Sequence, residues 1–264
     1  MTTMKKVVLG LLAVLILASL MGGLVGCSHK AEEVTLNVSA ASSLTNALGE
    51  INDLYTKKHS NVTITPNFDA SGTLQKQIQN GGPCDVFISA AKKNMDALAT
   101  DNLILTESRK NLLNNKIVLI VPKDSTLGLT DFNGLTNASV KTIAFGDPSV
   151  VPAGQYGKAA LTELGIYDQV KSKFLLCAKV TDVLTYVASG NVDAGIVYAT
   201  DALSSDQVKV VAEGPADVNA TIVYPVAVIK ASANPDAAQK YVDFLSSDQA
   251  KTVFENYGFV MAED

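Results

Sequence analysis

The sequence is poor in the residues that catalysis and metal binding most often require. Among 264 residues there are only two histidines and three cysteines. Neither His29 nor His59 belongs to a Ser/His/Asp or Cys/His arrangement, and no CxxC or Cys/His cluster indicates a structural metal. A Walker phosphate loop, a Rossmann fingerprint and a Gly-x-Ser-x-Gly elbow are also missing from the sequence. We therefore expect no enzymatic activity and no cofactor.

Basic residues are scarce after the N-terminal segment. Residues 1–26 contain two lysines and no acidic residue, so the remaining 19 basic and 26 acidic residues leave a formal charge of −7. Nucleic acid is therefore not an expected partner. An anionic ligand would gain nothing from long-range attraction, so hydrogen-bond donors close to it would have to bind it.

The N-terminal segment has the pattern of a secretory signal peptide. Lys5 and Lys6 precede an apolar run from residue 7 to residue 20, which predicts a signal over residues 1–26. Because the run is nearly long enough to span a bilayer, a retained anchor helix is the alternative. Leu-Val-Gly-Cys at 24–27 resembles a bacterial lipobox. We expect a lipid on Cys27, a tether over 27–33 and an extracytoplasmic protein anchored to the cell membrane as a lipoprotein through that lipid alone.

From Val34 onward, apolar β-branched runs alternate with helical patterns. The predicted strands after the first span residues 61–68, 85–89, 116–121, 141–145, 174–178, 194–198, 208–212 and 222–229. This order predicts an α/β fold in which ligands bind at the carboxyl ends of strands. No flexible linker divides it. We expect chain crossings near 115 and 228, with lobe 1 over 34–115 and 228–264 and lobe 2 over 116–227, and a helix starting at Pro235 that packs on lobe 1.

Cys84 and Cys177 are the two cysteines that remain after Cys27. They could pair in an oxidising compartment. However, the predicted lobes place them on opposite sides of a hinge, where a bridge would restrict closure. We expect two free, largely buried thiols.

Four predicted junctions share one pattern, in which a strand ends in small residues and a helix starts. They span residues 38–44, 68–74, 146–154 and 177–183. A helix start leaves its first N–H groups without intrahelical partners and carries roughly half a positive charge. Several such starts facing one point would form a site for a small anion.

Six motifs also occur in a characteristic order: Ala-Ala-Ser-Ser-Leu at 40–44, Ala-Ser-Gly-Thr-Leu at 70–74, Asp-Val-Phe-Ile-Ser-Ala at 85–90, Val-Pro-Ala-Gly-Gln-Tyr at 151–156, Gly-Ile-Val-Tyr at 195–198 and Tyr-Pro-Val-Ala at 224–227. In these motifs the chain resembles the molybdate-binding proteins of bacterial ABC transporters, which are extracytoplasmic solute-binding proteins with two lobes. The resemblance covers essentially all of the chain after Cys27. It implies a periplasmic-binding-protein-like fold (type II), a monomer, and an ABC permease with its ATPase as partners.

The resemblance also implies a ligand set for molybdate, and for tungstate, bound as the oxyanion without direct ligands to the metal. Ser43 and Ser71 would donate from hydroxyl and backbone N–H, Ala153 and Val180 from backbone N–H, and Tyr198 from its hydroxyl. The family usually has Asn-Val-Arg-Gln at the fourth junction, where this chain has Lys-Val-Thr-Asp at 179–182. A backbone contact from Val180 tolerates that difference.

Other interpretations remain open for these residues. Ser43 and Ser71 could be helix N-caps, and Tyr198 could be a packing residue with a hydrated hydroxyl. Asp147 and Asp182 would repel an anion, so we expect them to be helix caps or turn formers. Sulfate or phosphate is the alternative ligand, and a lipidated enzyme or sensor on the same fold is the alternative protein.

Overall fold

The computed structural model describes residues 32–263. The predicted signal peptide, Cys27 and most of the tether lie outside the described residues. The described residues from Glu33 onward form one compact unit. Within the described range, no helix combines the length and apolar character needed to cross a bilayer.

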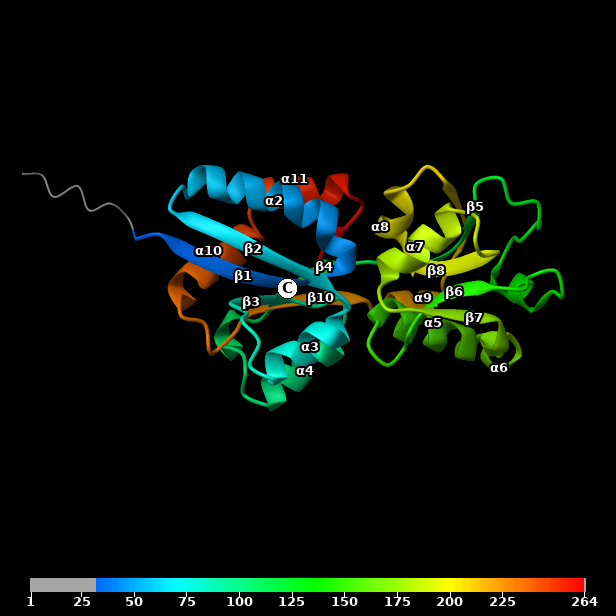
Figure 1. Cartoon of the computed structure of the whole chain (residues 1–264), viewed down its shortest axis with the longest axis horizontal. Helices are drawn as coiled ribbons and strands as arrows, with labels where there is room; N and C mark the ends of the chain where they lie inside the picture. The colour runs from blue at the N-terminus through cyan, green and yellow to red at the C-terminus, as the bar shows by residue number, and fades with distance from the viewer. Residues whose placement is uncertain (1–31, 264) are drawn as a thin grey trace, which may run out of the picture. The chain divides into compact units, whose positions relative to one another are not determined.

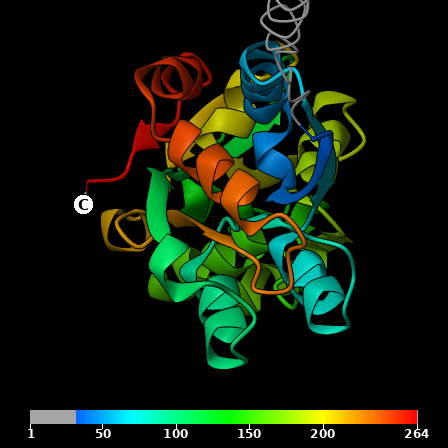
Figure 2. The ribbon, with the colours of Figure 1, turned by 90° about the vertical axis from the view of Figure 1, so that its left-hand side faces the viewer.

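The first of two sheets has six strands in the order β11-β4-β10-β3-β1-β2. Its strands are β1 (Val34–Ala41), β2 (Val62–Asp69), β3 (Val86–Ile88), β4 (Lys110–Asn114), β10 (Val223–Val228) and β11 (Val260–Met261). β1 runs parallel to β2 and β3, whereas β10 is antiparallel to β3 and β4. One face is covered by α2 (Thr45–Lys58), α10 (Pro235–Phe244) and α11 (Asp248–Asn256), and the other by α3 (Ser71–Gln79) and α4 (Lys92–Thr100) (Figures 1 and 2).

The second sheet has five strands in the order β7-β6-β8-β5-β9. They are β5 (Ile117–Pro122), β6 (Ile143–Gly146), β7 (Phe174–Cys177), β8 (Ala194–Tyr198) and β9 (Val208–Glu213). In Figure 1, α7 (Val180–Ala188) and α8 (Ala199–Leu203) lie on one face, and α5 (Pro152–Glu163), α6 (Tyr167–Val170) and α9 (Ala216–Asn219) on the other. The two mixed sheets flanked by helices confirm the predicted α/β class.

The chain passes from one sheet to the other twice. The first passage joins β4 to β5 across Asn115 and Lys116, where we expected it. The second precedes β10, because Val223–Val228 pairs with β3 and β4 in the first sheet. The predicted crossing near 228 is therefore wrong. The chain crosses between Asn219 and Val223, and β10 belongs to the first sheet. All six residues of β10 are buried, so the alternation of apolar and polar residues that would indicate its sheet is absent from its sequence.

Aromatic packing holds α10 against α2. Tyr55 and Tyr241 meet edge to face with ring centroids 5.2 Å apart, and the Tyr241 hydroxyl donates to Asn52 Oδ1 at 2.6 Å. Both rings are almost fully buried, and burial of a large apolar side chain contributes about 1.5–3 kcal/mol. As expected, the helix that begins at Pro235 therefore packs with the elements of the first sheet.

Two glycines bring the start of α5 against the end of β6. A Cβ on Gly154 would lie 1.9 Å from the carbonyl oxygen of Gly146, and a Cβ on Gly146 would lie 2.6 Å from a methyl carbon of Val151. Side chains at these two positions would push the helix away from the strand. The pair therefore fixes where the first N–H groups of α5 lie.

The two described cysteines, Cys84 and Cys177, are free and buried, which confirms the prediction. Burial raises the pKa of each thiol to about 11. Both thiols therefore stay protonated at neutral pH.

Candidate functional site

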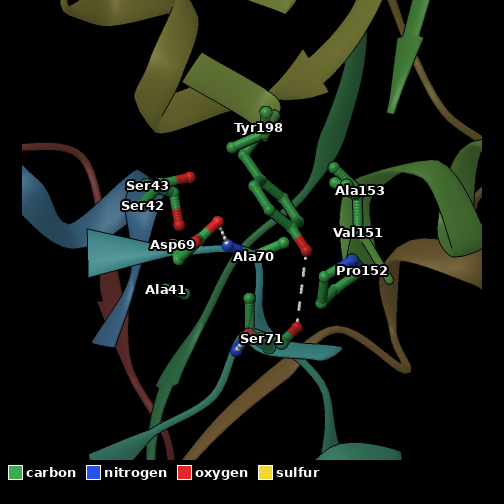
Figure 3. A pocket seen from close by; sticks show the side chains of 12 residues that line it. Ala41, Ser42, Ser43, Asp69, Ala70, Ser71, Val151, Pro152, Ala153 and Tyr198 are labelled. Carbon is green, nitrogen blue, oxygen red and sulfur yellow. Dashed lines mark hydrogen bonds between the residues drawn. The ribbon is translucent and has the colours of Figure 1, made fainter. Parts of the chain in front are cut away.

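One small pocket brings together the five residues selected from the sequence. Its lining consists of Ala41, Ser42, Ser43, Asp69, Ala70, Ser71, Ala90, Val151, Pro152, Ala153, Val180 and Tyr198. In Figure 3, Tyr198 points toward Ser71 from the opposite side, with Ser43 and Ala153 flanking the space between them. The pocket lies between the elements of the two sheets, because Ser43 and Ser71 follow β1 and β2 whereas Ala153, Val180 and Tyr198 follow or end β6, β7 and β8.

The two serine hydroxyls do not cap helices. Ser71 is the first residue of α3, yet its Oγ accepts a hydrogen bond from Ala90 N–H at 2.9 Å. Ser43 lies in the short 3₁₀ helix η1 (Ser42–Leu44), and its Oγ lies 3.0 Å from the Tyr224 hydroxyl. Neither helix start has a side-chain cap. The capping interpretation is therefore wrong for both residues.

Tyr198 ends β8 and is only 1% exposed. Its hydroxyl donates to the carbonyl of Ala90 across the pocket at 3.4 Å (Figure 3). Burial, and then the neighbouring Tyr224 and Tyr156, raise its pKa well above the usual value. The hydroxyl therefore keeps its proton and remains a donor. Since the long bond to Ala90 is weak by geometry, a stronger acceptor in the pocket could replace it.

Three α-helices start at the pocket wall. Ser71 is the first residue of α3, Ala153 the second of α5 and Val180 the first of α7. The first N–H groups of an α-helix have no intrahelical partner and lie at the positive end of the helix dipole. Pro152 occupies the first position of α5, where its missing N–H costs nothing. The wall of the pocket is therefore rich in donors although Asp69 is the one charged side chain that lines it.

No lysine, arginine or histidine is among the described residues that line this pocket. The one acidic lining residue, Asp69, uses Oδ1 to accept the N–H of Ala70 at 2.7 Å. Asp147 and Asp182 do not line the pocket. They accept N–H groups of Ser149 at 2.8 Å and Lys179 at 3.1 Å, which confirms them as local turn and cap residues.

The elements of the two sheets are in direct contact beside the pocket. Gly72 N–H donates to the carbonyl of Val150 at 2.9 Å, in addition to the Tyr198 bond to Ala90. The cavity volume is about 10 Å³, close to the space that one water molecule needs. The elements of the two sheets therefore meet at the pocket, and as it stands the pocket has room for about one water molecule.

A wider hollow of about 710 Å³ lies elsewhere, lined by Asn114–Lys116, Ala199, Glu213, Gly214 and further residues up to Val260. Its two charged side chains, Lys116 and Glu213, pair with each other at 3.0 Å and are both more than half exposed. It offers no set of convergent, buried donors. We therefore place the candidate site in the smaller pocket.

Comparison with known proteins places the chain in a family. The model of the bacterial extracellular solute-binding proteins matches residues 36–260, and the chain belongs to this family. Its membership agrees with the expectation of a binding protein rather than an enzyme, and the fold is that of the type II periplasmic binding proteins.

Individual relatives are similar over most of their length. YvgL of Bacillus subtilis, provisionally named an ABC transporter substrate-binding lipoprotein, is 45% identical over 86% of this chain and 87% of its own. The molybdate-binding protein ModA of Haemophilus influenzae is 38% identical over 87% and 91%. A solved substrate-binding domain from Clostridium difficile, provisionally assigned to a molybdenum ABC transporter, is 43% identical, with a TM-score of 0.67 over 87% of this chain and all of that one.

Proposed function

We propose that this protein is the substrate-binding component of an ABC importer and captures molybdate, or tungstate, as a tetrahedral oxyanion. The relatives named for molybdate and for ABC transport support this choice of ligand and of partners, a permease with its ATPase. The lipobox at Cys27 and the lipoprotein relative support anchoring outside the cytoplasmic membrane. The observation that carries the proposal is the pocket in which buried hydroxyls and the starts of three helices converge without a basic side chain.

Neutral donors can hold a dianion if each oxygen is hydrogen-bonded when it leaves water. Ser43 and Ser71 would each supply a hydroxyl and an N–H, Ala153 and Val180 an N–H, and Tyr198 a hydroxyl. A hydrogen bond to a charged group contributes about 1.5–3 kcal/mol, so about seven of them offset much of the lost hydration. Without a salt bridge to break, release to a transporter stays possible.

We further propose that the two sheets with their helices act as two lobes that close on the ligand. Ser43 and Ser71 belong to the first lobe, and Ala153, Val180 and Tyr198 to the second. An anion that accepts from both lobes stabilises the closed form over the open form by its differential interactions. The permease would then recognise the closed form as the loaded one.

Two physical filters would set selectivity. A pocket made of donors disfavours a protonated anion such as hydrogen phosphate, whose own proton needs an acceptor. Sulfate has the charge and shape of molybdate but is smaller, so a pocket fitted to the larger ion leaves some sulfate oxygens without full hydrogen bonding. Molybdate and tungstate are nearly equal in size, and both should bind.

Isothermal titration calorimetry on residues 28–264, refolded from denaturant to remove bound anions, tests the proposal. We expect one-to-one binding of molybdate and tungstate, with sulfate and phosphate silent. Ser71→Ala should weaken molybdate binding by about 10- to 100-fold because it removes one charge-assisted bond. The matched control Ser189→Ala changes a hydroxyl that bonds to the last turn of its own helix and to the Asn191 side chain just after it, and it should leave binding unchanged. Tight sulfate or phosphate binding would refute the molybdate assignment, and silence of all four anions would refute the proposed function.

A further inference from the structure

The Ser43 hydroxyl is tied to a buried group outside the pocket. Its Oγ lies 3.0 Å from the hydroxyl oxygen of Tyr224, a β10 residue that is fully buried and does not line the pocket. Burial raises the pKa of Tyr224 well above the usual value, so its hydroxyl carries a proton. The distance alone allows either hydroxyl to donate, and the direction depends on what else Tyr224 contacts.

Asn115 is the residue that sets this direction. Its Oδ1 accepts the N–H of Lys116 at 2.8 Å, which fixes the orientation of the side-chain amide. The Nδ2 group therefore faces inward, where it donates to Thr200 Oγ1 at 2.9 Å and to the Tyr224 hydroxyl at 3.3 Å. Asn115 is itself buried, at 7% exposure. Its amide can only donate to Tyr224, because the oxygen is already engaged on the other side.

The Tyr224 hydroxyl has Ser43 Oγ at hydrogen-bonding distance and the Tyr198 hydroxyl as a further neighbour, and the Tyr198 hydroxyl is already engaged with Ala90. Because Tyr224 accepts from Asn115, its own hydrogen would be left without a partner in a buried site unless it pointed to Ser43 Oγ, and an unpaired buried donor costs about 1–3 kcal/mol. Tyr224 therefore donates to Ser43. The Ser43 hydrogen cannot point back along the same line, so it is left for one of the two hollows that Ser43 lines, the candidate pocket and a neighbouring hollow that includes Thr45 and Thr181.

We infer that Asn115 and Tyr224 are positioning residues that hold the Ser43 hydroxyl as a donor toward the bound oxyanion. This inference rests on the proposed function. The chain of bonds runs from Asn115 Nδ2 to Tyr224, from Tyr224 to Ser43, and from Ser43 to the ligand, so each bond polarises the next in the same direction. Neither positioning residue touches the ligand.

Ser71 is oriented in the same way by a different group. The Ala90 N–H donates to Ser71 Oγ at 2.9 Å, so the Ser71 hydrogen is also left for the pocket. Both serine oxygens thus receive a hydrogen bond from the protein before a ligand arrives. Each oxygen is then less able to accept a hydrogen bond from a protonated ligand, which strengthens the discrimination against protonated anions.

A double-mutant cycle on molybdate binding, measured by calorimetry, tests the role of Tyr224. Tyr224→Phe keeps the ring and removes the hydroxyl, and we expect molybdate affinity to fall by about three- to tenfold. In a Ser43→Ala background the same change should alter affinity by less than about twofold, because the group through which Tyr224 acts is gone. A merely structural role of Tyr224 would weaken binding equally in both backgrounds. Tyr241→Phe, which removes another buried hydroxyl remote from the pocket, is the matched control and should bind as wild type.

A second variant tests the same inference if Tyr224→Phe lowers the thermal midpoint so much that its binding cannot be measured. Asn115→Asp keeps the acceptor for Lys116 N–H but offers the Tyr224 hydroxyl an acceptor where it had a donor, so Ser43 should donate to Tyr224 instead of to the ligand. We expect a loss close to that of Ser43→Ala and little further loss in the Ser43→Ala background. A loss of equal size in both backgrounds would show that the change does not act through Ser43 and would overturn the inference.

The cycle also separates this inference from the proposed function. If the wild type does not bind molybdate but binds tungstate or sulfate, the molybdate assignment fails and the cycle is measured with the anion that binds. Wild-type affinity in Tyr224→Phe, or equal losses in both backgrounds, would overturn the inference while leaving the proposed function intact. If no anion binds, both the proposed function and this inference are refuted.

Discussion

Gly72 is the position at which the account can be tested without changing any of the five proposed ligand-binding residues. It is the second residue of α3, next to Ser71, and its N–H donates to the carbonyl of Val150 in the facing elements. A Cβ at this position would lie 2.6 Å from the Val150 oxygen and 2.7 Å from the Val150 Cα. Both obstructing atoms belong to the backbone and cannot rotate away. Gly72→Ala should therefore prevent the closed form while leaving each half folded.

The size of the effect follows from these distances. Relieving the contact to an ordinary 3.4 Å requires the halves to separate by about 0.8 Å, which lengthens the 2.9 Å bond beyond hydrogen-bonding range. Losing that bond and one charge-assisted bond to the ligand costs about 2–4.5 kcal/mol. Affinity for molybdate should fall by about 30-fold to about 2,000-fold. Since alanine is favoured over glycine in a helix by up to about 1 kcal/mol, the thermal midpoint without ligand should not fall.

Calorimetry with molybdate and thermal unfolding without ligand measure the two quantities on the same variant. Gly49→Ala is the matched control, because Gly49 also lies in a helix and an added Cβ there meets nothing within 4 Å. Small-angle scattering should show compaction on ligand binding for Gly49→Ala and not for Gly72→Ala. Wild-type affinity in Gly72→Ala would refute the argument that binding requires the closed approach of residues 72 and 150.

Two further predictions concern buried titratable groups. Burial raises the pKa of Asp201 to about 7, only partly countered by the hydrogen bond from Tyr198 N–H. The folded protein thus holds a proton that the unfolded chain releases above about pH 4, so stability should fall as pH rises from about 4 to 7. Urea unfolding across that range should show the fall in wild type and a smaller one in Asp201→Asn; an equal fall in both would contradict the assignment. Cys84 and Cys177, whose pKa burial raises to about 11, should react slowly with iodoacetamide in the folded protein and quickly in urea, and rapid labelling of either thiol in the folded protein would show that it is exposed.

Much of the fold could be predicted because strong apolar runs lie in buried strands. β5, β6 and β8 have every residue buried except the last of β5, and each was expected within two residues of its bounds. β4 was not expected, because Lys110–Asn114 has two apolar residues among five and forms a strand only through its partners β10 and β11. Such tertiary pairing leaves no local pattern to detect.

The candidate site, like the fold, could be predicted only in part. The four strand-to-helix junctions could be located from local sequence, because a small residue before a helix start is a local signal, whereas the individual ligand residues, Tyr198 among them, followed only from the family resemblance. The Ala90 contacts, the bond from Asn115 to Tyr224 and the bond between Tyr224 and Ser43 could not, since they join residues 19 to 181 positions apart. Tyr224 lies in a motif of the resemblance, but nothing in that motif shows which hydroxyl it faces.

The most direct test is a crystal structure of the protein with tungstate, located by the anomalous scattering of tungsten. We expect one strong peak in the pocket, with oxygens in hydrogen-bonding range of the Ser43, Ser71 and Tyr198 hydroxyls and of the Ala153 and Val180 N–H groups, and no basic side chain in contact. A peak outside this pocket, or an anion held by a lysine or arginine, would contradict the account.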